Sequence, residues 1–309
     1  MRAISQDTYG GPEVLREVEQ PVPALGPGQI LVEVKAAGVN PTDWRNRAAP
    51  LWFDRLPLTL GFDVSGVVAQ VGYGVTIHQT GDEVFGMLPY PQGIGAYAEY
   101  VAAPARAFVP KPTEIDHVQA AAIPLAALTA YQALVDTAHI TPGQRVLIHA
   151  AAGGVGHLAV QIAKHLGAYV IGTASAGKHD LLRSLGADEV IDYISTDFRS
   201  LATDIDAALV PMTGETRSQT IEVLRPGATL VTLLRGLTPE DERAAAEREA
   251  RLATLLVEHD QAGMAAIAEM IRAGHLRAHV QQVFPLTEVA QAHALGEEGH
   301  LTGKLVLVV

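Results

Sequence analysis

The stretch that decides the fold is Arg145-Val146-Leu147-Ile148-His149-Ala150-Ala151-Ala152-Gly153-Gly154-Val155-Gly156. An apolar run ends at a cluster of small residues, and a helical pattern follows, with apolar residues every four positions from 158 to 166. A strand, a tight glycine turn and a helix in this order direct backbone N–H groups and the positive end of a helix dipole at one point. This arrangement predicts a pyrophosphate site, and the alternative is an ordinary turn that binds nothing. The residues expected to contact the pyrophosphate are Gly153, Gly154, Val155 and Gly156.

The end of the next predicted strand indicates which dinucleotide the turn would hold. That strand ends at Ser175, and Lys178 follows three residues later. Enzymes that use NAD place Asp or Glu about twenty residues past the glycines to bind the ribose 2′-hydroxyl. No carboxylate stands at this corner, and a hydroxyl with a nearby cation suits a 2′-phosphate. The sequence therefore favours NADPH over NADH. The alternative for Lys178 is a solvated residue in the first turn of a helix.

Composition narrows the class of protein. The chain has 309 residues, of which 48% are hydrophobic and 18% charged, and its formal net charge is −12. These values fit a globular α/β protein of two domains and disfavour nucleic acid as a partner. The absence of cysteine excludes disulfides, thiolate catalysis and cysteine-ligated zinc. We expect no signal peptide, no membrane-spanning segment and a cytoplasmic location.

The pattern of predicted strands and helices changes twice along the chain. The first 120 residues or so read as a small β-barrel, with strands expected at 28–36, 63–72, 82–86 and 98–101. An alanine-rich helix at 120–135 precedes alternating strands and helices from 145 to 273, which indicates a doubly wound parallel sheet. Two strands around a short helix end the chain. We expect a substrate domain at 1–122 and 276–309, and a dinucleotide-binding domain at 123–275.

This order of domains resembles the medium-chain dehydrogenase/reductase superfamily, and several motifs carry the resemblance over nearly the whole chain. One motif, 37–45, resembles the signature of the zinc-free quinone oxidoreductase, or ζ-crystallin-like, branch. The others are the opening 9–15, the segment Gly61-Phe62-Asp63-Val64-Ser65-Gly66, and the final strand from Gly303. The resemblance implies a GroES-like β-barrel domain joined to a Rossmann domain.

Three positions separate this chain from the zinc alcohol dehydrogenases. The resemblance places the zinc ligands of those enzymes at Asn40, at Phe62 and near Leu125. Phenylalanine and leucine side chains offer no lone pair to a metal, and asparagine is at best a weak ligand. We therefore expect no metal, and hydride transfer without a Lewis acid.

The candidate catalytic residues are Asn40, Asp43 and Tyr97. Asn40 stands at the former metal position and offers an amide N–H to a substrate or enolate oxygen; the alternative is that it only fixes the turn before Pro41. Asp43 follows on the same segment, where an acid at a helix start is the alternative. Tyr97 is a candidate proton donor, although packing within a barrel strand is the interpretation that we favour.

The resemblance adds further candidate residues around the cofactor. Those it implies are Arg45, Thr129, Tyr193, Gly303 and Lys304. A surface position for Arg45, a plain helix residue at Thr129 and strand-end packing at Tyr193 are the alternatives. The segment 210–215 departs from the family, because Val210 replaces the usual acid and only Gly214 remains of a glycine pair.

The function implied is an NADPH-dependent, zinc-independent reductase of a quinone or an α,β-unsaturated carbonyl. Reduction of such acceptors needs few catalytic groups from the protein, because the cofactor supplies the hydride and a few neutral hydrogen-bond donors stabilise the enolate. An enoyl-thioester reductase and a non-catalytic NADPH-binding redox sensor stay open as alternatives. We expect a homodimer in which the apolar segment 252–257 pairs with its twin by strand addition.

Overall fold

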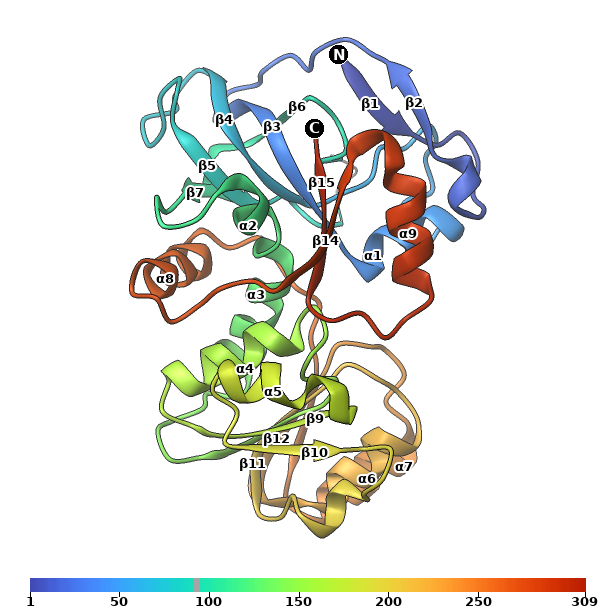
Figure 1. Cartoon of the computed structure of the whole chain (residues 1–309), viewed down its shortest axis with the longest axis vertical. Helices are drawn as coiled ribbons and strands as arrows, with labels where there is room; N and C mark the ends of the chain where they lie inside the picture. Colours follow the sequence, from blue (N-terminus) through green and yellow to red (C-terminus); the bar gives the residue numbers. More distant parts are fainter. Residues whose placement is uncertain (92–94) are drawn as a thin grey trace. The chain divides into compact units, whose positions relative to one another are not determined.

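The protein is described here by a computed structural model that covers residues 1–91 and 95–309 (Figure 1). The chain forms two compact units, one made of Met1–Leu128 with Glu258–Val309 and the other of Thr129–Val257. These units differ from the expected domains chiefly in one helix, α8 (Gln261–Arg272), which packs against strand β7 of the first unit. The sequence had placed this helix in the domain ending at 275.

The first unit is built on a seven-stranded sheet with the order β14-β15-β3-β4-β5-β7, and β6 also pairs with β3. Its neighbouring strands are antiparallel except β14 and β15, which run parallel. The strands are β3 (Gln29–Val39), β4 (Asp63–Val71), β5 (Glu83–Met87), β6 (Tyr100–Pro104), β7 (Phe108–Pro110), β14 (Val280–Pro285) and β15 (Lys304–Val308). A separate pair consists of β1 (Arg2–Ser5) and β2 (Arg16–Glu19). The strands expected in this part of the chain are confirmed, with bounds shifted by at most three residues.

Helices cover parts of this sheet and carry the candidate site. The helices and short helical turns of this part of the chain are η1 (Pro12–Val14), α1 (Pro41–Ala48), η2 (Ala105–Ala107), α2 (His117–Ala121), α3 (Pro124–Tyr131), α8, η6 (Leu286–Glu288) and α9 (Val289–Glu297). Helix α1 packs against α9 from the end of the chain, as Figure 1 shows. The helical stretch expected at 120–135 is confirmed except at 122–123, where α3 starts anew at Pro124, because proline favours the first position of a helix and interrupts one already under way.

The second unit is a six-stranded parallel sheet with the order β10-β9-β8-β11-β12-β13. Its strands are β8 (Arg145–Ile148), β9 (Tyr169–Ala174), β10 (Glu189–Asp192), β11 (Ile205–Val210), β12 (Leu224–Thr232) and β13 (Arg251–Thr254). The chain first builds outward from β8 to β9 and β10, and then returns to the other side of β8. The order therefore reverses between β8 and β11, which is where doubly wound sheets bind ligands.

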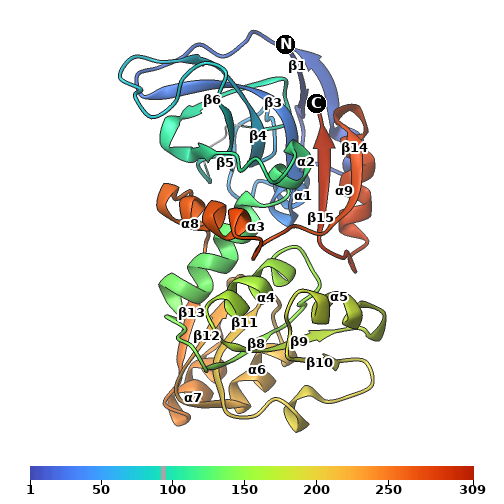
Figure 2. The same cartoon turned by 60° about the vertical axis from the view of Figure 1, so that its left-hand side comes forward.

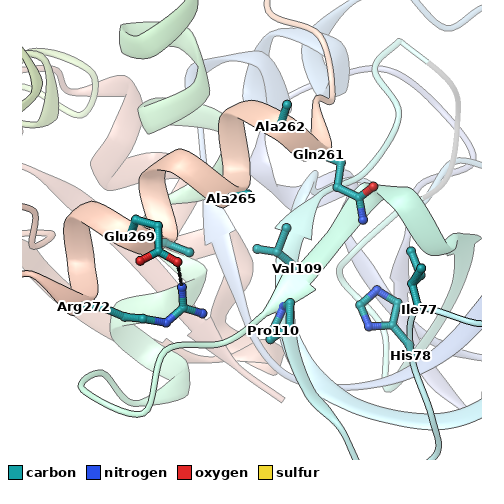
Figure 3. A pocket seen from close by; sticks show the side chains of 10 residues that line it. Ile77, His78, Val109, Pro110, Gln261, Ala262, Ala265, Glu269 and Arg272 are labelled. Carbon is teal, nitrogen blue, oxygen red and sulfur yellow. Dashed lines mark hydrogen bonds and ion pairs between the residues drawn. The ribbon is translucent and has the colours of Figure 1, made fainter.

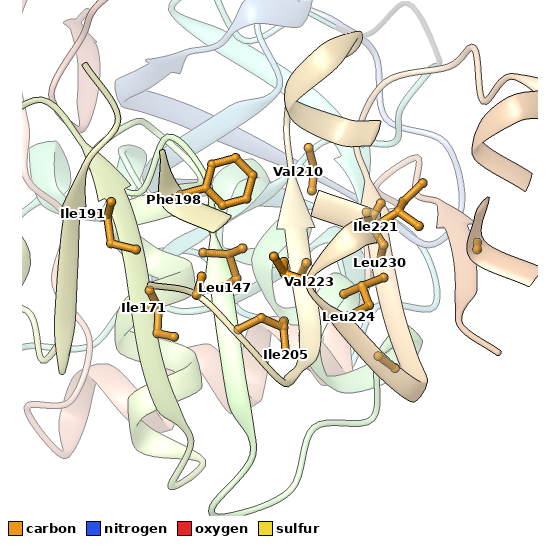
Figure 4. Packing of buried hydrophobic residues seen from close by; sticks show 14 residues of the cluster. Leu147, Ile171, Ile191, Phe198, Ile205, Val210, Ile221, Val223, Leu224 and Leu230 are labelled. Carbon is orange, nitrogen blue, oxygen red and sulfur yellow. The ribbon is translucent and has the colours of Figure 1, made fainter. Parts of the chain in front are cut away.

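Helices cover both faces of the parallel sheet. Helices α4 (Gly156–His165) and α5 (His179–Ser184) lie on one face, and α6 (Glu215–Glu222) and α7 (Pro239–Glu247) on the other (Figures 1 and 2). The shorter helical turns are η3 (Gln132–Thr137), η4 (Ala176–Lys178) and η5 (Phe198–Ser200). On the face covered by α6 and α7, buried apolar side chains form a cluster that includes Leu147, Ile171, Ile221 and Leu230 (Figure 4). The doubly wound fold predicted from the sequence is confirmed.

Candidate active site

The glycine turn of the second unit lies directly after β8, at the carboxyl edge of the parallel sheet. A Cβ on Gly156 would lie 2.3 Å from the carbonyl oxygen of Ala150, so only glycine allows this approach of helix to strand. Helix α4 begins at Gly156, and the N–H groups of His157, Leu158 and Ala159 already donate to the carbonyl oxygens of Gly153 and Val155. Residues 153–155 are half-buried. A helix start of this kind favours an anion, and the pyrophosphate site expected here stays a prediction.

The residues predicted at the 2′-phosphate lie along the same edge. In the parallel register Asp192 of β10 pairs with Ala174 of β9, so Tyr193 and Ser175 follow from neighbouring strand ends. Lys178 lies three residues on, where partial burial lowers its pKa. Ser175 is half-buried and Tyr193 is exposed. No acidic residue occupies 174–179, and the carboxylate of Asp192 accepts from the N–H of Ile194 and the hydroxyl of Ser195.

Buried histidines support the turn. The hydroxyl of Thr220 donates to the carbonyl of Thr216, so it accepts from Nε2 of His149 at 2.9 Å, and Nδ1 of His149 then accepts from Thr173. Burial lowers the pKa of His149 to about 4, which keeps the ring neutral. Nδ1 of His157 lies 2.8 Å from the carbonyl oxygen of Gly153. Both rings hold the structure together, as the sequence suggested.

Three other predicted cofactor residues lie in different surroundings. Thr129 is buried in α3, and Arg45 is exposed on α1 of the first unit. Gly303 has a φ of +71°, and a Cβ there would lie 1.9 Å from the carbonyl oxygen of His279. The backbone of the turn into β15 is therefore sufficient reason for a glycine at position 303.

Asn40 lies at the end of β3, next to a buried carboxylate. Its Nδ2 donates to Oδ2 of Asp63 at 2.8 Å, and its Oδ1 accepts from Nζ of Lys304. Oδ1 of Asp63 accepts from the backbone N–H of Leu125 at 2.6 Å. Asn40 is 2% exposed, and Asp63 is fully buried. The structure thus brings Asn40 and Lys304 together, although the sequence had assigned them to different roles.

A second buried chain of hydrogen bonds joins Asp43 to Tyr97. The backbone N–H of Asn40 and the hydroxyl of Tyr97 both donate to Oδ2 of Asp43, at 2.7 and 3.0 Å. Asp43 and Tyr97 have no exposed surface, and burial raises the pKa of Asp43 to about 7. Burial likewise raises the pKa of Tyr97 well above its usual value. Asp43 therefore holds both the first turn of α1 and the Tyr97 ring.

The same network of hydrogen bonds extends from Tyr97 to helix α9. Nη1 of Arg47 lies 3.3 Å from Nδ1 of His293, and because arginine only donates, Nδ1 must accept. Nε2 then carries the hydrogen and points at the Tyr97 hydroxyl, 3.3 Å away. Burial and the nearby Arg47 lower the pKa of His293 to about 3, so the ring is neutral. Arg47 also pairs with Glu297 at 2.6 Å.

Sequence reasoning missed Asp63, Arg47 and His293 as members of these clusters. Asp63 stood within a quoted motif and Arg47 just beyond one, and neither had a pattern of its own. His293 lies in a tail helix whose sequence carries no sign of its partner. Their roles arise only from pairing across as many as 250 positions of sequence.

The donor set around Asn40 does not fit zinc. Phe62 is buried and stacks on Phe53, and Leu125 contributes only its backbone N–H to Asp63. Over residues 1–91 and 95–309 no group of three or more His, Cys, Asp or Glu side chains could hold a metal. We derive no step through a metal.

One hollow, of about 550 Å³, lies elsewhere on the first unit, between α8 and β7 (Figure 3). Its walls include Val109, Ala265 and the ion pair of Glu269 with Arg272. None of the predicted site residues lines it, so it does not contribute to the candidate site.

Comparison with known proteins matches both parts of the chain. Residues 26–113 match the alcohol dehydrogenase GroES-like domain, and residues 185–307 match the family described as zinc-binding dehydrogenase. The first match confirms the GroES-like domain expected from the sequence. Among the described residues no helix is both long and apolar enough to cross a membrane.

Similar proteins extend over the whole chain. A chloroplastic quinone oxidoreductase of Triphysaria versicolor is 33% identical, over 99% of this chain and 98% of its own. A chloroplastic NADPH-dependent alkenal/one oxidoreductase of Arabidopsis thaliana is 34% identical, over 99% of this chain and 79% of its own.

Solved structures agree. A quinone oxidoreductase from Coxiella burnetii has a TM-score of 0.93 and 36% identity, covering 100% of this chain and 99% of its own. The Escherichia coli quinone oxidoreductase complexed with NADPH has a TM-score of 0.89 and 28% identity, covering 100% of both chains. With the motifs, the two-unit fold and a site without zinc ligands, these matches show that the chain belongs to the zinc-free quinone oxidoreductase branch of the medium-chain dehydrogenase/reductase superfamily.

Proposed function

We propose that this protein is an NADPH-dependent reductase that transfers hydride to a quinone or an α,β-unsaturated carbonyl. The observation that carries the proposal is the glycine turn at the sheet's switch point, with Ser175 and Lys178 at the next strand end and no acidic residue within 174–179. The names of its relatives, which include quinone and alkenal/one oxidoreductases, support the same class of substrate.

When bound, the nicotinamide would supply the hydride. The residues that would hold the cofactor are Gly153, Gly154, Val155, Gly156, Ser175, Lys178 and Tyr193, and we further propose Thr129, Arg45 and Gly303 as cofactor residues. Backbone N–H groups and the dipole of α4 would bind the pyrophosphate, and Lys178 would pair with the 2′-phosphate. The chain's part in the second unit is thus to bind and orient.

In the first unit, we assign Asn40 to the substrate oxygen. Reduction of a conjugated acceptor moves electron density onto an oxygen several bonds from the hydride, so one well-placed neutral donor can stabilise the product enolate. Because Asn40 is 2% exposed, a hydrogen bond from its amide would form almost without water, where it is worth more.

Asp43 and Tyr97 would hold Asn40 in place through hydrogen bonds to its backbone and to each other. Asp43 accepts the backbone N–H of Asn40, and Tyr97 fixes the carboxyl that does so. Since neither side chain has exposed surface, we propose that both act as positioning residues rather than touch the substrate.

The test is oxidation of NADPH and of NADH by a panel of quinones, enals, enones and enoyl thioesters. We expect turnover with quinones, enals or enones, and a lower KM for NADPH than for NADH. Turnover with enoyl thioesters alone would indicate the enoyl-thioester reductase. Tight NADPH binding without turnover on any acceptor would indicate the redox sensor and refute the reductase.

We also propose a homodimer. Strand β13 (Arg251–Thr254) ends the order of the parallel sheet and pairs with β12 alone, so its outer edge can accept a second copy. Light scattering at micromolar concentration should give twice the chain mass of 32.7 kDa, and a monomer there would refute the pairing.

A further inference from the structure

The ammonium of Lys304 is fully engaged by the protein. Its Nζ donates to the carbonyl of Val39 at 3.1 Å and to Oδ1 of Asn40, and it lies 3.4 Å from Oδ2 of Asp63. A lysine ammonium has three N–H donors. Three acceptors therefore use them all, and with Lys304 only 3% exposed, none is left for a cofactor phosphate.

The same contacts fix the direction of the Asn40 amide. Lysine only donates and a carboxylate only accepts, so Oδ1 of Asn40 must face Lys304 and Nδ2 must face Asp63. Asp63 takes one of the two hydrogens on Nδ2. The other makes no hydrogen bond within the part of the chain that the structure describes.

The ammonium of Lys304 also compensates the free energy needed to bury the carboxylate of Asp63. An unpaired carboxylate at the position of Asp63, which is fully buried, would strongly destabilise the fold, and the ammonium 3.4 Å away compensates it. The cation on Oδ1 draws electron density from the amide, which makes the remaining N–H a stronger donor.

We propose that Lys304 and Asp63 are positioning residues that together orient and polarise the Asn40 amide toward the substrate oxygen, and that Lys304 is not a ligand of the cofactor. This inference rests on the proposed function, since it assigns a role within the same reductase site. It replaces the cofactor role expected from the sequence for Lys304.

The central experiment measures two quantities for each variant: Kd for NADPH by fluorescence titration, and kcat/KM for an acceptor that the wild type reduces. Lys304→Met alone would leave Asp63 buried and unpaired, so the double variant Lys304→Met/Asp63→Asn removes both charges at once. We expect it to fold, to bind NADPH within about twofold of the wild type, and to lose about tenfold or more in kcat/KM.

A second arm tests whether the pair acts through Asn40. In an Asn40→Ala background, adding Lys304→Met/Asp63→Asn should change kcat/KM by less than about twofold, because the group it orients is already gone. Lys304→Arg in the otherwise wild-type chain keeps the charge and should lose less kcat/KM than Lys304→Met/Asp63→Asn. A merely structural pair would give additive losses instead.

Lys35→Met is the control, since Lys35 is a half-exposed lysine of β3 paired with Glu33, and both quantities should stay as in the wild type. A tenfold weaker Kd for NADPH in the double variant would overturn the proposal in favour of a cofactor ligand. An unchanged kcat/KM would overturn it in favour of a purely structural pair. Wild type that turns over nothing would instead refute the proposed function, which is a separate result.

Discussion

In the second unit the candidate site is made mostly of backbone, whereas in the first unit it is made of side chains that meet from distant segments. The glycine turn is formed by the backbone itself. The sheet that precedes it packs on an apolar core on the face of α6 and α7 (Figure 4). The cluster around Asn40 rests on Asp63, Lys304 and the backbone of Leu125. The first construction depends on the shape of the backbone and on few side chains, whereas the second depends on polar side chains that several partners hold in place.

The two constructions also respond differently to change. An apolar core loses contacts and gains a cavity when a side chain is shortened. A buried polar cluster loses a partner and leaves another polar group unsatisfied. Substitutions in the second unit should therefore act on stability or cofactor affinity, and those in the first on rate or on pH dependence.

The largest effect is expected from the core of the second unit. Leu230→Ala should lower the free energy of unfolding by roughly 2–5 kcal/mol, because Leu230 is completely buried in β12 and a cavity would remain. Urea unfolding measures it. Leu201→Ala is the matched control, since Leu201 is 51% exposed and should cost no more than about 0.5 kcal/mol. Equal losses would mean that the core does not carry the stability of this unit.

Next in size is Asn40→Ala, which should lower kcat/KM roughly 10- to 1,000-fold through loss of one donor to the developing enolate. Affinity for NADPH should stay nearly constant, because the glycine turn belongs to the other unit. Single-turnover hydride transfer and melting temperature should be measured on the same preparation. A lower melting temperature with a normal transfer rate would mean that Asn40 only fixes the turn before Pro41.

Asp43→Asn should change how stability depends on pH. The pKa of Asp43 is about 7 in the folded chain and about 3.9 unfolded. Between these values the folded state keeps a proton that the unfolded state has lost, so Asp43 makes the wild type less stable as pH rises. His293, with a folded pKa of about 3, acts with the opposite sign below about 6.5 and is present in both proteins.

The difference between variant and wild type isolates the Asp43 contribution. The free energy of unfolding of Asp43→Asn, relative to wild type, should rise by about 2 kcal/mol from pH 5 to pH 7 and level off above pH 8. Urea unfolding at these three pH values measures it. A difference that does not vary with pH would show that Asp43 is ionised throughout.

The smallest effect concerns cofactor choice. Lys178→Ala should weaken NADPH binding by about 1–2 kcal/mol, through loss of one charge-assisted hydrogen bond to the 2′-phosphate. Binding of NADH should hardly change, because NADH lacks that phosphate. Fluorescence titration with both cofactors measures the two values, and an equal loss for both would contradict the assignment.

The comparison of units also explains what the sequence could predict. Strand, turn and helix around Gly156 depend on neighbours within a few residues, and so do the strands that follow, so local patterns predicted them. Gly156 could be predicted because its spacing from the strand matches a position where the start of the helix approaches the turn too closely for a side chain. Ser175 and Lys178 could be placed because parallel strands end at one edge.

The polar clusters of the first unit lay beyond such reasoning. Asn40 and Lys304 are 264 positions apart, and Tyr97 and His293 are 196 apart. The resemblance alone placed Lys304 among the cofactor residues, and the sequence around it carries no sign of its partners. The register of β15 against β3, which pairs Leu305 with Val39, brings its ammonium to Asn40 and Asp63.

That register has a consequence for the order in which the molecule is made. Strand β15 is synthesised after the entire second unit, yet it pairs with β3, near the beginning of the chain. A nascent chain can present all of 129–257 to the solvent while β3 still lacks this neighbour and Asn40 still lacks its ammonium. The second unit is therefore synthesised in full before the first, which closes only when β15 pairs with β3.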